Sequence, residues 1–422
     1  MANKEKNIYV YECWSSNEPC FMGTLFVDCS RLETYSFEYD SDWLRQNTLH
    51  QFTIDPNLEF YQGRQYPNGK NLFGIFSDSS PDRWGRVLMK RREALLAKKE
   101  NRKPKKLQES DYLLGVYDKT RMGALRFKLE KDGPFISDDQ NEAVPPMANL
   151  RDLEAAARGF EISEDKENEM WLRQLIKPGS SLGGARPKAT VQDTDGNLWI
   201  AKFPSQHDEY DIGAWEKVTS ELARLCGLNV PETELKKFSK LGSTFLTKRF
   251  DREKEKRIHF TSAMTMLGKE DGASAEDGSG YLDIVSLIKT NGCNPKDDIR
   301  ELWKRIIFNM AVSNTDDHLR NHGFILHKYG WRLSPLYDVN PIPYGNELSL
   351  NVTYSENSIS ISLLKEFANQ IDISEEDAEN DIRFVLKTVS DNWERLALAY
   401  GISHESINYM RQAFLFSDEK EE

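Results

Sequence analysis

The chain has 422 residues, of which 39% are hydrophobic, so we expect two or three folded units with a sizeable core. The formal net charge of −12 disfavours direct binding of free DNA, because both molecules are negatively charged. No apolar run approaches the ~18 residues of a membrane helix, the start MANKEKNIYVYE lacks the apolar core of a signal peptide, and the five cysteines form no CxxC pair. We therefore expect a cytoplasmic protein without membrane contact, disulfide framework or zinc ribbon.

The first 140 residues are expected to form a mixed α/β subdomain. Strand patterns occur in NIYVYE, CFMGTLFV and ETYSFEYD, and later in TRMGALRFKLE. Between them, SSPDRWGRVLMKRREALLAK predicts a helix with Ser or Asp near its start and Pro81 early. Residues 83–106 carry eleven basic and only two acidic residues. This segment is either a solvated basic helix face or a patch for nucleic acid or an acidic partner.

Residues 141–253 give the clearest pattern. After helices in LRDLEAAARGFEI and SEDKENEMWLRQLI, the loop GSSLGGARPK precedes strands in KATVQ and NLWIAKFP. The DTDG between these strands contains the Asp-Gly pair of a tight hairpin. Apolar residues at steps of three and four predict a helix from Ile212 to Leu225, and ETELKKFS and STFLTKRF predict a further strand pair.

Residues 254–422 are expected to be mainly helical. DIVSLIKTN and IRELWKRIIFNMAVSN predict two helices, and Leu302, Ile306 and Met310 mark the apolar face of the second. FILHKYG and WRLSPLYDV predict a hairpin with Gly330 at its turn.

The stretch NTDDHLRN combines residue types that phosphoryl transfer requires. Asp316 and Asn321 have four residues between them, the spacing of the protein-kinase catalytic loop. In that loop the Asp orients or accepts the proton of the attacking hydroxyl, and the Asn is a neutral oxygen ligand of Mg²⁺. Asp338, which we place at the end of the second hairpin strand, supplies the carboxylate that hard cations prefer.

Upstream residues are suited to binding the nucleotide phosphates. Lys202 lies at the end of an apolar strand, as in the kinase strand whose Lys reaches the α- and β-phosphates. Glu216 in the following helix is placed to pair with that Lys. Backbone N–H groups of GSSLGGARPK can bind phosphate oxygens. The loop is not a Walker A sequence, because Gly184 is followed by Ala185 and Arg186.

Each feature has a simpler interpretation when taken alone. A D-x4-N spacing arises by chance, Lys202 is typical of a surface lysine, Glu216 of a solvated helix residue and Asp338 of a turn. The order of five such features, each on a suitable strand, helix or loop, favours phosphoryl transfer.

The remaining polar residues of the loop are expected to act indirectly. His318 either hydrogen-bonds within the loop to hold Asp316, the interpretation we favour, or acts as a base. Arg320 either neutralises phosphate charge or braces a carboxylate. Asp317 has no assigned role and is expected to be a solvated or loop-capping carboxylate.

The motifs SSLGGARPKA, IAKFP, LTKRFDR, NTDDHLRNHGF and LSPLYDV occur in this order, preceded by FGIFSDSSPDRWGR and RMGALRF. Together they resemble the HipA-like serine/threonine kinases, which are toxins of bacterial toxin–antitoxin modules. The resemblance runs through most of the chain. It implies an α+β, protein-kinase-like bilobal fold with an N-terminal subdomain over residues 1–140, an N-lobe over 141–253 and a helical C-lobe over 254–422.

The resemblance implies ATP and Mg²⁺ as cofactors. Asp316 would be the catalytic base, Asn321 and Asp338 would bind the metal, and Lys202 would hold phosphates. The other residues that the resemblance or the loop pattern places at the nucleotide are Ser181, Gly183, Gly184, Ala185, Glu216, Lys248 and Phe250 at the hinge, Asp251 near the ribose, His318 and Arg320. Ser181, or the adjacent Ser180, would be autophosphorylated, which expels the loop and inactivates the kinase.

Family partners and substrates give further expectations. The partner would be a small antitoxin, typically a helix-turn-helix DNA-binding protein like HipB, and DNA would be contacted only through that complex. The substrate would be an aminoacyl-tRNA synthetase or a similar protein, whose phosphorylation inhibits translation. A small-molecule phosphotransferase and a catalytically silent nucleotide-binding module are the alternatives. Pro187, Arg186 and Asp317 depart from the usual family pattern. Pro187 removes one backbone N–H donor and stiffens the loop, and Arg186 adds a positive charge to it.

Overall fold

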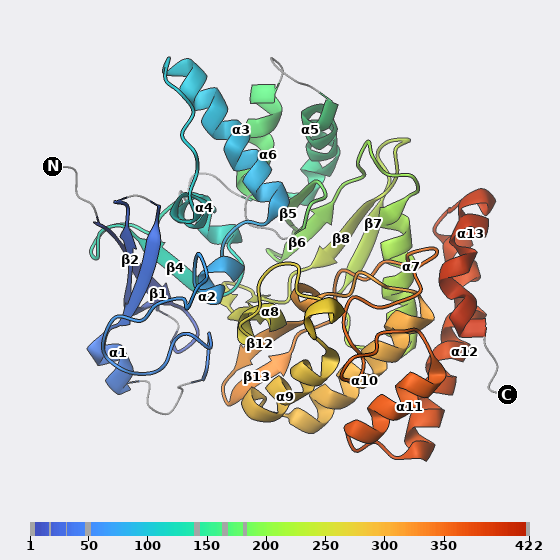
Figure 1. Ribbon diagram of the computed structural model, residues 1–422. Coiled ribbons are helices and arrows are strands. Elements are labelled where there is room, and N and C mark those ends of the chain that lie inside the picture. The colour runs from blue at the N-terminus through green and yellow to red at the C-terminus, as the bar shows by residue number, and fades with distance from the viewer. Residues whose placement is uncertain are drawn as a thin grey trace. The chain divides into compact units, whose positions relative to one another are not determined.

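The computed structural model describes residues 5–16, 18–30, 32–46, 52–138, 144–162, 168–179 and 184–418 (Figure 1). The chain divides into two compact units. The first comprises Met1–His207 and Leu246–Thr261, and the second comprises Asp208–Phe245 and Ser262–Glu422. The division of the kinase region into lobes at residue 253 stays a prediction.

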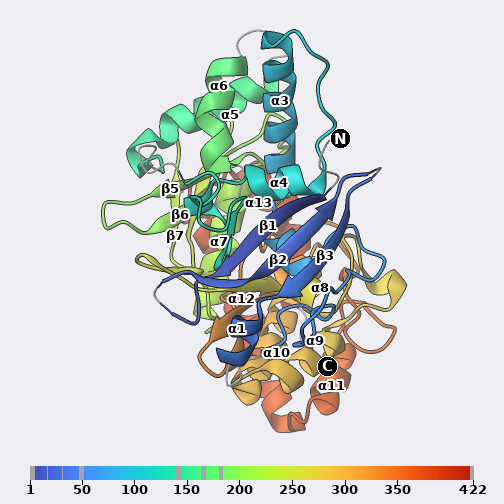
Figure 2. The ribbon, with the colours of Figure 1, turned by 90° about the vertical axis from the view of Figure 1, so that its left-hand side faces the viewer.

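The first unit begins with a four-stranded antiparallel sheet in the order β3-β2-β1-β4 (Figure 2). Its strands are β1 (Glu5–Glu12), β2 (Cys20–Asp28), β3 (Thr34–Tyr39) and β4 (Leu125–Lys128). Ile8 and Val10, Leu25 and Val27, and Phe37 are fully buried, so alternate residues form the core as the period of two predicted.

The helices of this unit follow β3 and β4 along the chain. They are α1 (Ser41–Gln46), α2 (Gly74–Asp78), α3 (Arg83–Lys99), α4 (Glu109–Gly115), α5 (Leu150–Ile162) and α6 (Asn168–Gly179). The helix α3 begins where the sequence predicts, because the Asp82 carboxylate accepts the N–H of Arg83 at 2.7 Å and Pro81 precedes it. It buries Trp84 and Leu88, which are one turn apart on the same face.

A second sheet has the order β5-β6-β8-β7. Its strands are β5 (Lys188–Gln192), β6 (Leu198–Lys202), β7 (Thr233–Lys236) and β8 (Thr244–Lys248). The predicted hairpin is confirmed: Lys188 pairs with Lys202, and the Asp193 carboxylate accepts the backbone N–H groups of Asp195 and Asn197 in the turn. The short strands β9 (Arg252–Glu253), β10 (Lys256–Arg257) and β11 (Phe260–Ser262) follow β8. The boundary between the two units falls inside β8 and inside β11.

The second unit is mainly helical, as expected. Its helices are α7 (Ile212–Leu225), α8 (Ala263–Met266), α9 (Tyr281–Asn291), α10 (Pro295–Ala311), α11 (Ile361–Gln370), α12 (Glu375–Ala399) and α13 (His404–Met410). The predicted face of α10 is confirmed, because Leu302, Ile306 and Met310 are all 0% exposed. Trp393 of α12 stacks on Phe414 with ring centroids 4.5 Å apart and extends the core.

The hairpin of the second unit differs from the prediction at its end. The strands β12 (Gly323–His327) and β13 (Gly330–Leu333) pair as expected around Gly330, whose φ is 136°. However, β13 ends at Leu333, so the placement of Asp338 at a strand end is wrong. Pro335 lacks a backbone N–H and cannot extend the ladder, which explains why the strand stops. Asp338 instead lies in an irregular segment that connects β13 to the following loop.

Candidate functional site

The candidate catalytic loop follows directly on the end of α10. The helix stops at Ala311, and Ser313 then adopts a left-handed φ of 48°, which turns the chain away from the helix axis. Asp316 is exposed, whereas the side chain of Asp317 is only 1% exposed. Of the two adjacent carboxylates, only that of Asp316 therefore faces solvent, where a substrate hydroxyl can approach it.

Asp317 is the centre of a buried hydrogen-bond network. Its Oδ2 accepts a hydrogen bond from the Tyr281 hydroxyl at 2.7 Å and another from Asn309 Nδ2 at 2.8 Å, and lies 2.8 Å from His322 Nε2. The expectation that Asp317 is solvated is wrong. Burial opposes the charged form, but the charge of His322 and the hydrogen bonds from His322 and Tyr281 outweigh it and keep the pKa of Asp317 below its usual value. The same burial raises the pKa of Tyr281 well above its usual value.

Hydrogen bonds within the loop join the two predicted catalytic residues. The backbone N–H of His318 donates to the Asp316 carbonyl at 3.0 Å, and the N–H of Asn321 donates to the His318 carbonyl at 2.8 Å. Asn321 Nδ2 also donates to the Asp316 carbonyl at 3.2 Å. Because the amide nitrogen makes this bond, the amide oxygen is the atom of Asn321 that suits a cation.

The segment around Asp338 is attached to the same loop. The N–H of Asn340 donates to Asn314 Oδ1 at 3.4 Å, and the N–H of Ile342 donates to the Ser313 carbonyl at 3.1 Å. Asp338 itself has φ of 59°, a conformation that is uncommon for residues other than glycine and is enriched at functional sites. The second unit thus brings Asp316, Asn321 and Asp338 into one connected arrangement.

Asn309 links the helix to both parts of this arrangement. Its Oδ1 accepts a hydrogen bond from Asn314 Nδ2 at 3.0 Å, while its own Nδ2 binds Asp317. On the other side, the hydroxyl of Thr219 on α7 donates to the carbonyl of Val339 at 2.6 Å. The backbone next to Asp338 is therefore held by α7, the helix that carries Glu216.

His318 and Arg320 have structural contacts within the second unit. His318 contributes its backbone to the loop, and the histidine that bonds an aspartate through its ring is His322, which the sequence reasoning missed. Arg320 Nε lies 3.2 Å from a carboxylate oxygen of Asp271, so Arg320 braces a carboxylate, one of its two predicted roles. The Arg320 carbonyl also accepts the hydroxyl of Tyr337 at 2.6 Å.

Lys202 and Glu216 belong to different units. Lys202 is the last residue of β6 in the first unit and is half-buried. Glu216 is buried on α7 in the second unit, with 5% exposure. Their ion pair stays a prediction.

The end of the Gly-rich loop is held by the start of α3. The Asp82 carboxylate accepts the N–H of Gly184 at 2.7 Å, and the N–H of Trp84 donates to the Gly184 carbonyl at 3.1 Å. Gly184 has φ of 82°, so a glycine suits this position. The motif SSPDRWGR therefore has a physical role in positioning the loop. Ala185 follows within the described part, whereas the predicted residues Ser180, Ser181 and Gly183 lie outside the described residues.

The predicted hinge residues continue into a buried ionic cluster. Lys248 ends β8, and Phe250 lies 6.1 Å from Phe260 between ring centroids. Asp251 is 1% exposed and accepts hydrogen bonds from Arg249, from Arg252 and from the backbone N–H of Gly123. Burial opposes its charge, but Arg249 and Arg252 hold its pKa well below the usual value.

This cluster fixes the hinge to the segment before β4. Arg249 Nη1 donates to the Thr120 carbonyl at 2.6 Å, and Arg252 Nη1 donates to the Gly123 carbonyl at 3.0 Å. With both oxygens bonded inside the protein, Asp251 is not placed for a direct contact with a ribose. We therefore assign Asp251 to holding the hinge backbone.

Oxygen donors suitable for Mg²⁺ are present in the second unit. The Asp338 carboxylate and the Asn321 amide oxygen are hard ligands, and Mg²⁺ usually takes only one or two protein oxygens and completes its shell with phosphate and water. In the described ranges no group of three or more His, Cys, Asp or Glu could hold a metal ion by itself. These two oxygen donors therefore suit the predicted Mg²⁺.

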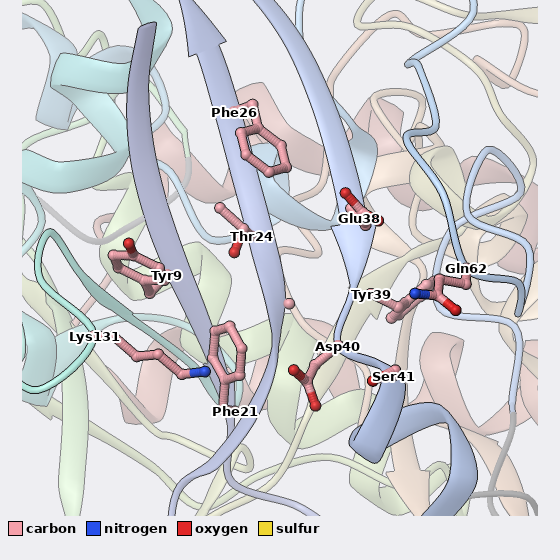
Figure 3. Close-up of a pocket in the computed structure, with 11 residues that line it drawn as sticks. Tyr9, Phe21, Thr24, Phe26, Glu38, Tyr39, Asp40, Ser41, Gln62 and Lys131 are labelled. Carbon is pink, nitrogen blue, oxygen red and sulfur yellow. The ribbon is translucent and has the colours of Figure 1, made fainter.

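A separate hollow of about 310 Å³ lies on the N-terminal sheet (Figure 3). Tyr9, Phe21, Glu38 and Asp40 are among its lining residues, and Lys131 Nζ lies 4.3 Å from the centre of the Phe21 ring. None of the residues predicted for phosphoryl transfer lines this hollow. None of the helices in the described ranges combines the length and the hydropathy that a membrane span requires.

Comparison with known proteins gives a consistent match. The family model of the HipA-like C-terminal domain matches residues 180–393. A protein of Haemophilus influenzae with the provisional name of a kinase is 31% identical over 205 residues, which cover 43% of this chain and 60% of that protein. The serine/threonine-protein kinase toxin HipA of Shewanella oneidensis is 24% identical over 227 residues, which cover 47% of this chain and 51% of that protein. The chain thus spans between 41% and 60% of the length of the curated relatives it matches.

A solved structure matches over nearly the whole chain. It is a chain from the complex of HipA, HipB and their operator DNA from Shewanella oneidensis, with a TM-score of 0.68 at 16% identity. The match covers 97% of this chain and 96% of that chain. At this identity the likeness shows the fold alone, and it confirms the expected fold class.

Proposed function

The chain belongs to the HipA-like family, and on that basis we propose that it is an ATP- and Mg²⁺-dependent serine/threonine protein kinase. The observation that carries this proposal is the arrangement around NTDDHLRN. Asp316 is exposed on a loop that the buried Asp317 anchors through its hydrogen bonds. Asp338 lies on a segment that is hydrogen-bonded to the same loop. This connection supports the proposal, because a base and a metal ligand must flank the same phosphoryl group.

Each residue has a defined task in this reaction. The Asp316 carboxylate would accept or orient the proton of the attacking hydroxyl, which raises the nucleophilicity of its oxygen. Asn321 and Asp338 would hold Mg²⁺, which neutralises phosphate charge when bound. Lys202 would hold the α- and β-phosphates, with Glu216 as the partner that orients its ammonium group. The hydrogen bonds of the loop would keep Asp316 and Asn321 in place before the substrate arrives.

We further propose that the kinase acts as the toxin of a toxin–antitoxin module. The solved structure of the matching fold is a complex of HipA with HipB and operator DNA, which supports a HipB-like antitoxin as the partner here. DNA would then be bound through the antitoxin. The target would be an aminoacyl-tRNA synthetase or a similar protein, and phosphorylation of Ser181 or Ser180 would switch the kinase off.

One experiment distinguishes this function from its alternatives. The full chain is incubated with γ-labelled ATP and Mg²⁺, alone and in cell lysate, beside the variant Asp316→Asn. Label on the chain itself or on a lysate protein, lost in the variant, is the expected result. Label on a metabolite alone would indicate a small-molecule phosphotransferase. Binding of ATP without turnover would indicate a silent nucleotide-binding module.

A further inference from the structure

Three tyrosines form a row on the second unit. Tyr344 lies in the loop that follows Asp338, Tyr409 lies on α13 and Tyr210 lies just before α7. The ring centroids of Tyr344 and Tyr409 are 6.1 Å apart in an edge-to-face arrangement, and those of Tyr409 and Tyr210 are 6.0 Å apart. Tyr344 is 68% exposed and Tyr409 is 39% exposed. The row is therefore an aromatic surface in contact with solvent.

The loop that carries Tyr344 is bonded to the catalytic loop. The N–H of Ile342 donates to the Ser313 carbonyl at 3.1 Å, and the Ser349 hydroxyl donates to the Thr315 carbonyl at 2.8 Å. A Cβ placed on Gly345 would lie only 2.5 Å from the side chain of Thr315, so the loop packs closely against the residue before Asp316.

Tyr344 is held in an unfavourable backbone conformation. Its φ is 69°, which is a genuine outlier for a bulky side chain and is kept only where the surroundings enforce it. An exposed aromatic ring at such a position gains little for the stability of the fold. It is better explained by a contact with another molecule.

We propose that Tyr344, Tyr409 and Tyr210 form the docking surface for the polypeptide that carries the phosphoacceptor hydroxyl. This inference rests on the proposed kinase function and names the surface that binds its protein substrate. Small-molecule sites are concave and enclose their ligand, whereas this surface is an open row of rings with substantial exposure. Tyrosines supply a large contact area with little loss of side-chain entropy, which suits a protein partner.

The charges on the same segments indicate the chemistry of this polypeptide. Glu209, Glu347 and Glu405 are exposed and lie within four residues of a tyrosine of the row. Arg411, which lies two residues after Tyr409, pairs with Glu394 at 3.2 Å. The surface therefore fits a segment that combines basic residues with aliphatic, aromatic or proline side chains, which pack on tyrosine rings.

A peptide-library measurement tests this inference. Random-sequence peptides around a fixed serine, scanned position by position, are phosphorylated with γ-labelled ATP by the full chain and by Tyr344→Ala, Tyr409→Ala and the double variant. We expect selection of basic residues by the wild type. For the best peptide we expect a KM about tenfold higher in the double variant, which corresponds to roughly 1.4 kcal/mol. We also expect unchanged kcat at saturating peptide and unchanged KM for ATP.

Tyr354→Ala is the matched control, because Tyr354 is 81% exposed in the same stretch of the chain. It should leave both KM values unchanged. Equal peptide KM in the wild type and the double variant, with normal ATP turnover, would overturn the docking surface. So would a dimer of the chain that the double variant converts to monomer without a change in peptide KM. Label transferred only to a small molecule, or absence of any ATP turnover in the wild type, would instead overturn the protein-kinase function itself.

Discussion

Asp316 and Asp317 are neighbours in the sequence, but their carboxylates lie in opposite environments. The first is exposed, and the second is buried and bonded to Tyr281, Asn309 and His322. The four-residue spacing to Asn321 distinguishes the two from sequence alone. The role of Asp317 could not be predicted, because its partners are separated from it by 36, eight and five residues and only the fold brings them together.

Replacing Asp317 should lower the free energy of unfolding, whereas replacing Asp316 should leave it nearly unchanged. In Asp317→Asn an NH2 group replaces one of the accepting carboxylate oxygens and faces other hydrogen-bond donors. The negative charge beside His322 is also lost. We expect the free energy of unfolding to fall by roughly 2 to 4 kcal/mol. Asp316→Asn, an exposed site one residue away, should change it by less than about 0.5 kcal/mol. Urea unfolding followed by tryptophan fluorescence measures both, and similar values for the two variants would refute the buried network.

His259 should make the free energy of unfolding depend on pH below about 6.5. Burial lowers the pKa of His259 from 6.5 to about 3, and its ring stacks on Trp14 with centroids 4.4 Å apart. Because the folded pKa lies below the unfolded one, the unfolded chain binds an additional proton between these values. The stability contribution is therefore complete above pH 6.5 and is lost as the pH falls.

The variant His259→Phe, which keeps a ring beside Trp14, isolates this effect. Relative to the variant, the wild type should lose about 1.4 kcal/mol of unfolding free energy for each pH unit below the unfolded pKa. Urea unfolding at pH 7.5, 6 and 5 gives the comparison. Parallel pH profiles would show that His259 is not held neutral in the folded protein.

At the scale of elements, positions set by local pattern were predictable and positions set by irregular backbone were not. The strands β5 and β6, the helix α7 and the buried face of α10 follow from period and turn residues. The sequence pattern does not predict that β13 ends at Leu333. It also does not predict that Asp251 holds the hinge backbone. Asp338 lies in an irregular segment, and Asp251 was expected at a ribose although Arg249, Arg252 and Gly123 surround it. Neither an aspartate with left-handed backbone nor a buried ionic cluster produces a periodic pattern in the sequence.

Gly123 is the point at which the ionic cluster of Asp251, Arg249 and Arg252 contacts the segment before β4. It has φ of 73°, and a Cβ there would lie 3.2 Å from the backbone nitrogen of Phe260 and 3.3 Å from His259 Nδ1. Gly69 has φ of 86° with no atom within 4 Å of such a Cβ, so it provides a matched control. Gly69→Ala should cost about 1 kcal/mol for the left-handed backbone alone.

Gly123→Ala should cost more than this control, because it adds steric overlap with the hinge to the same backbone penalty. We expect a destabilisation of at least about 2 kcal/mol. Thermal and urea unfolding of the two variants give the difference. Equal destabilisation would mean that the hinge does not pack against this glycine.

At the scale of the whole molecule, the basic segment stands out from an acidic chain. Part of its charge is used internally, since Arg86 pairs with Glu109 at 2.6 Å and Lys105 with Asp111 at 2.7 Å. Lys98, Lys99 and Lys103 are exposed at the end of α3 and just beyond it. In the proposed toxin–antitoxin complex, these lysines would contact the DNA phosphates while the antitoxin binds the operator.

Reversing Lys98, Lys99 and Lys103 to Glu should therefore weaken the binding of the proposed antitoxin complex to DNA. We expect the slope of log affinity against log salt to decrease in magnitude by up to about three, because that many phosphate contacts are lost. The same reversal at the exposed residues Lys236, Lys237 and Lys240 is the matched control. If the slope of log affinity against log salt is unchanged in the first variant, the segment does not contact DNA and is a solvated helix face.

In the proposed reaction, Asp316 is the base of a phosphoryl-transfer site, and Asp317 holds the loop that carries it. The most direct test is the rate of γ-phosphoryl transfer from ATP, per folded molecule, in the wild type, Asp316→Asn and Asp317→Asn. We predict that Asp316→Asn lowers the rate by roughly 10² to 10⁴ with its stability unchanged. Asp317→Asn, measured at a temperature where it is folded, should lower the rate far less than Asp316→Asn, because it loosens the support of the loop without removing the base. Equal losses of rate in the two variants would contradict the claim.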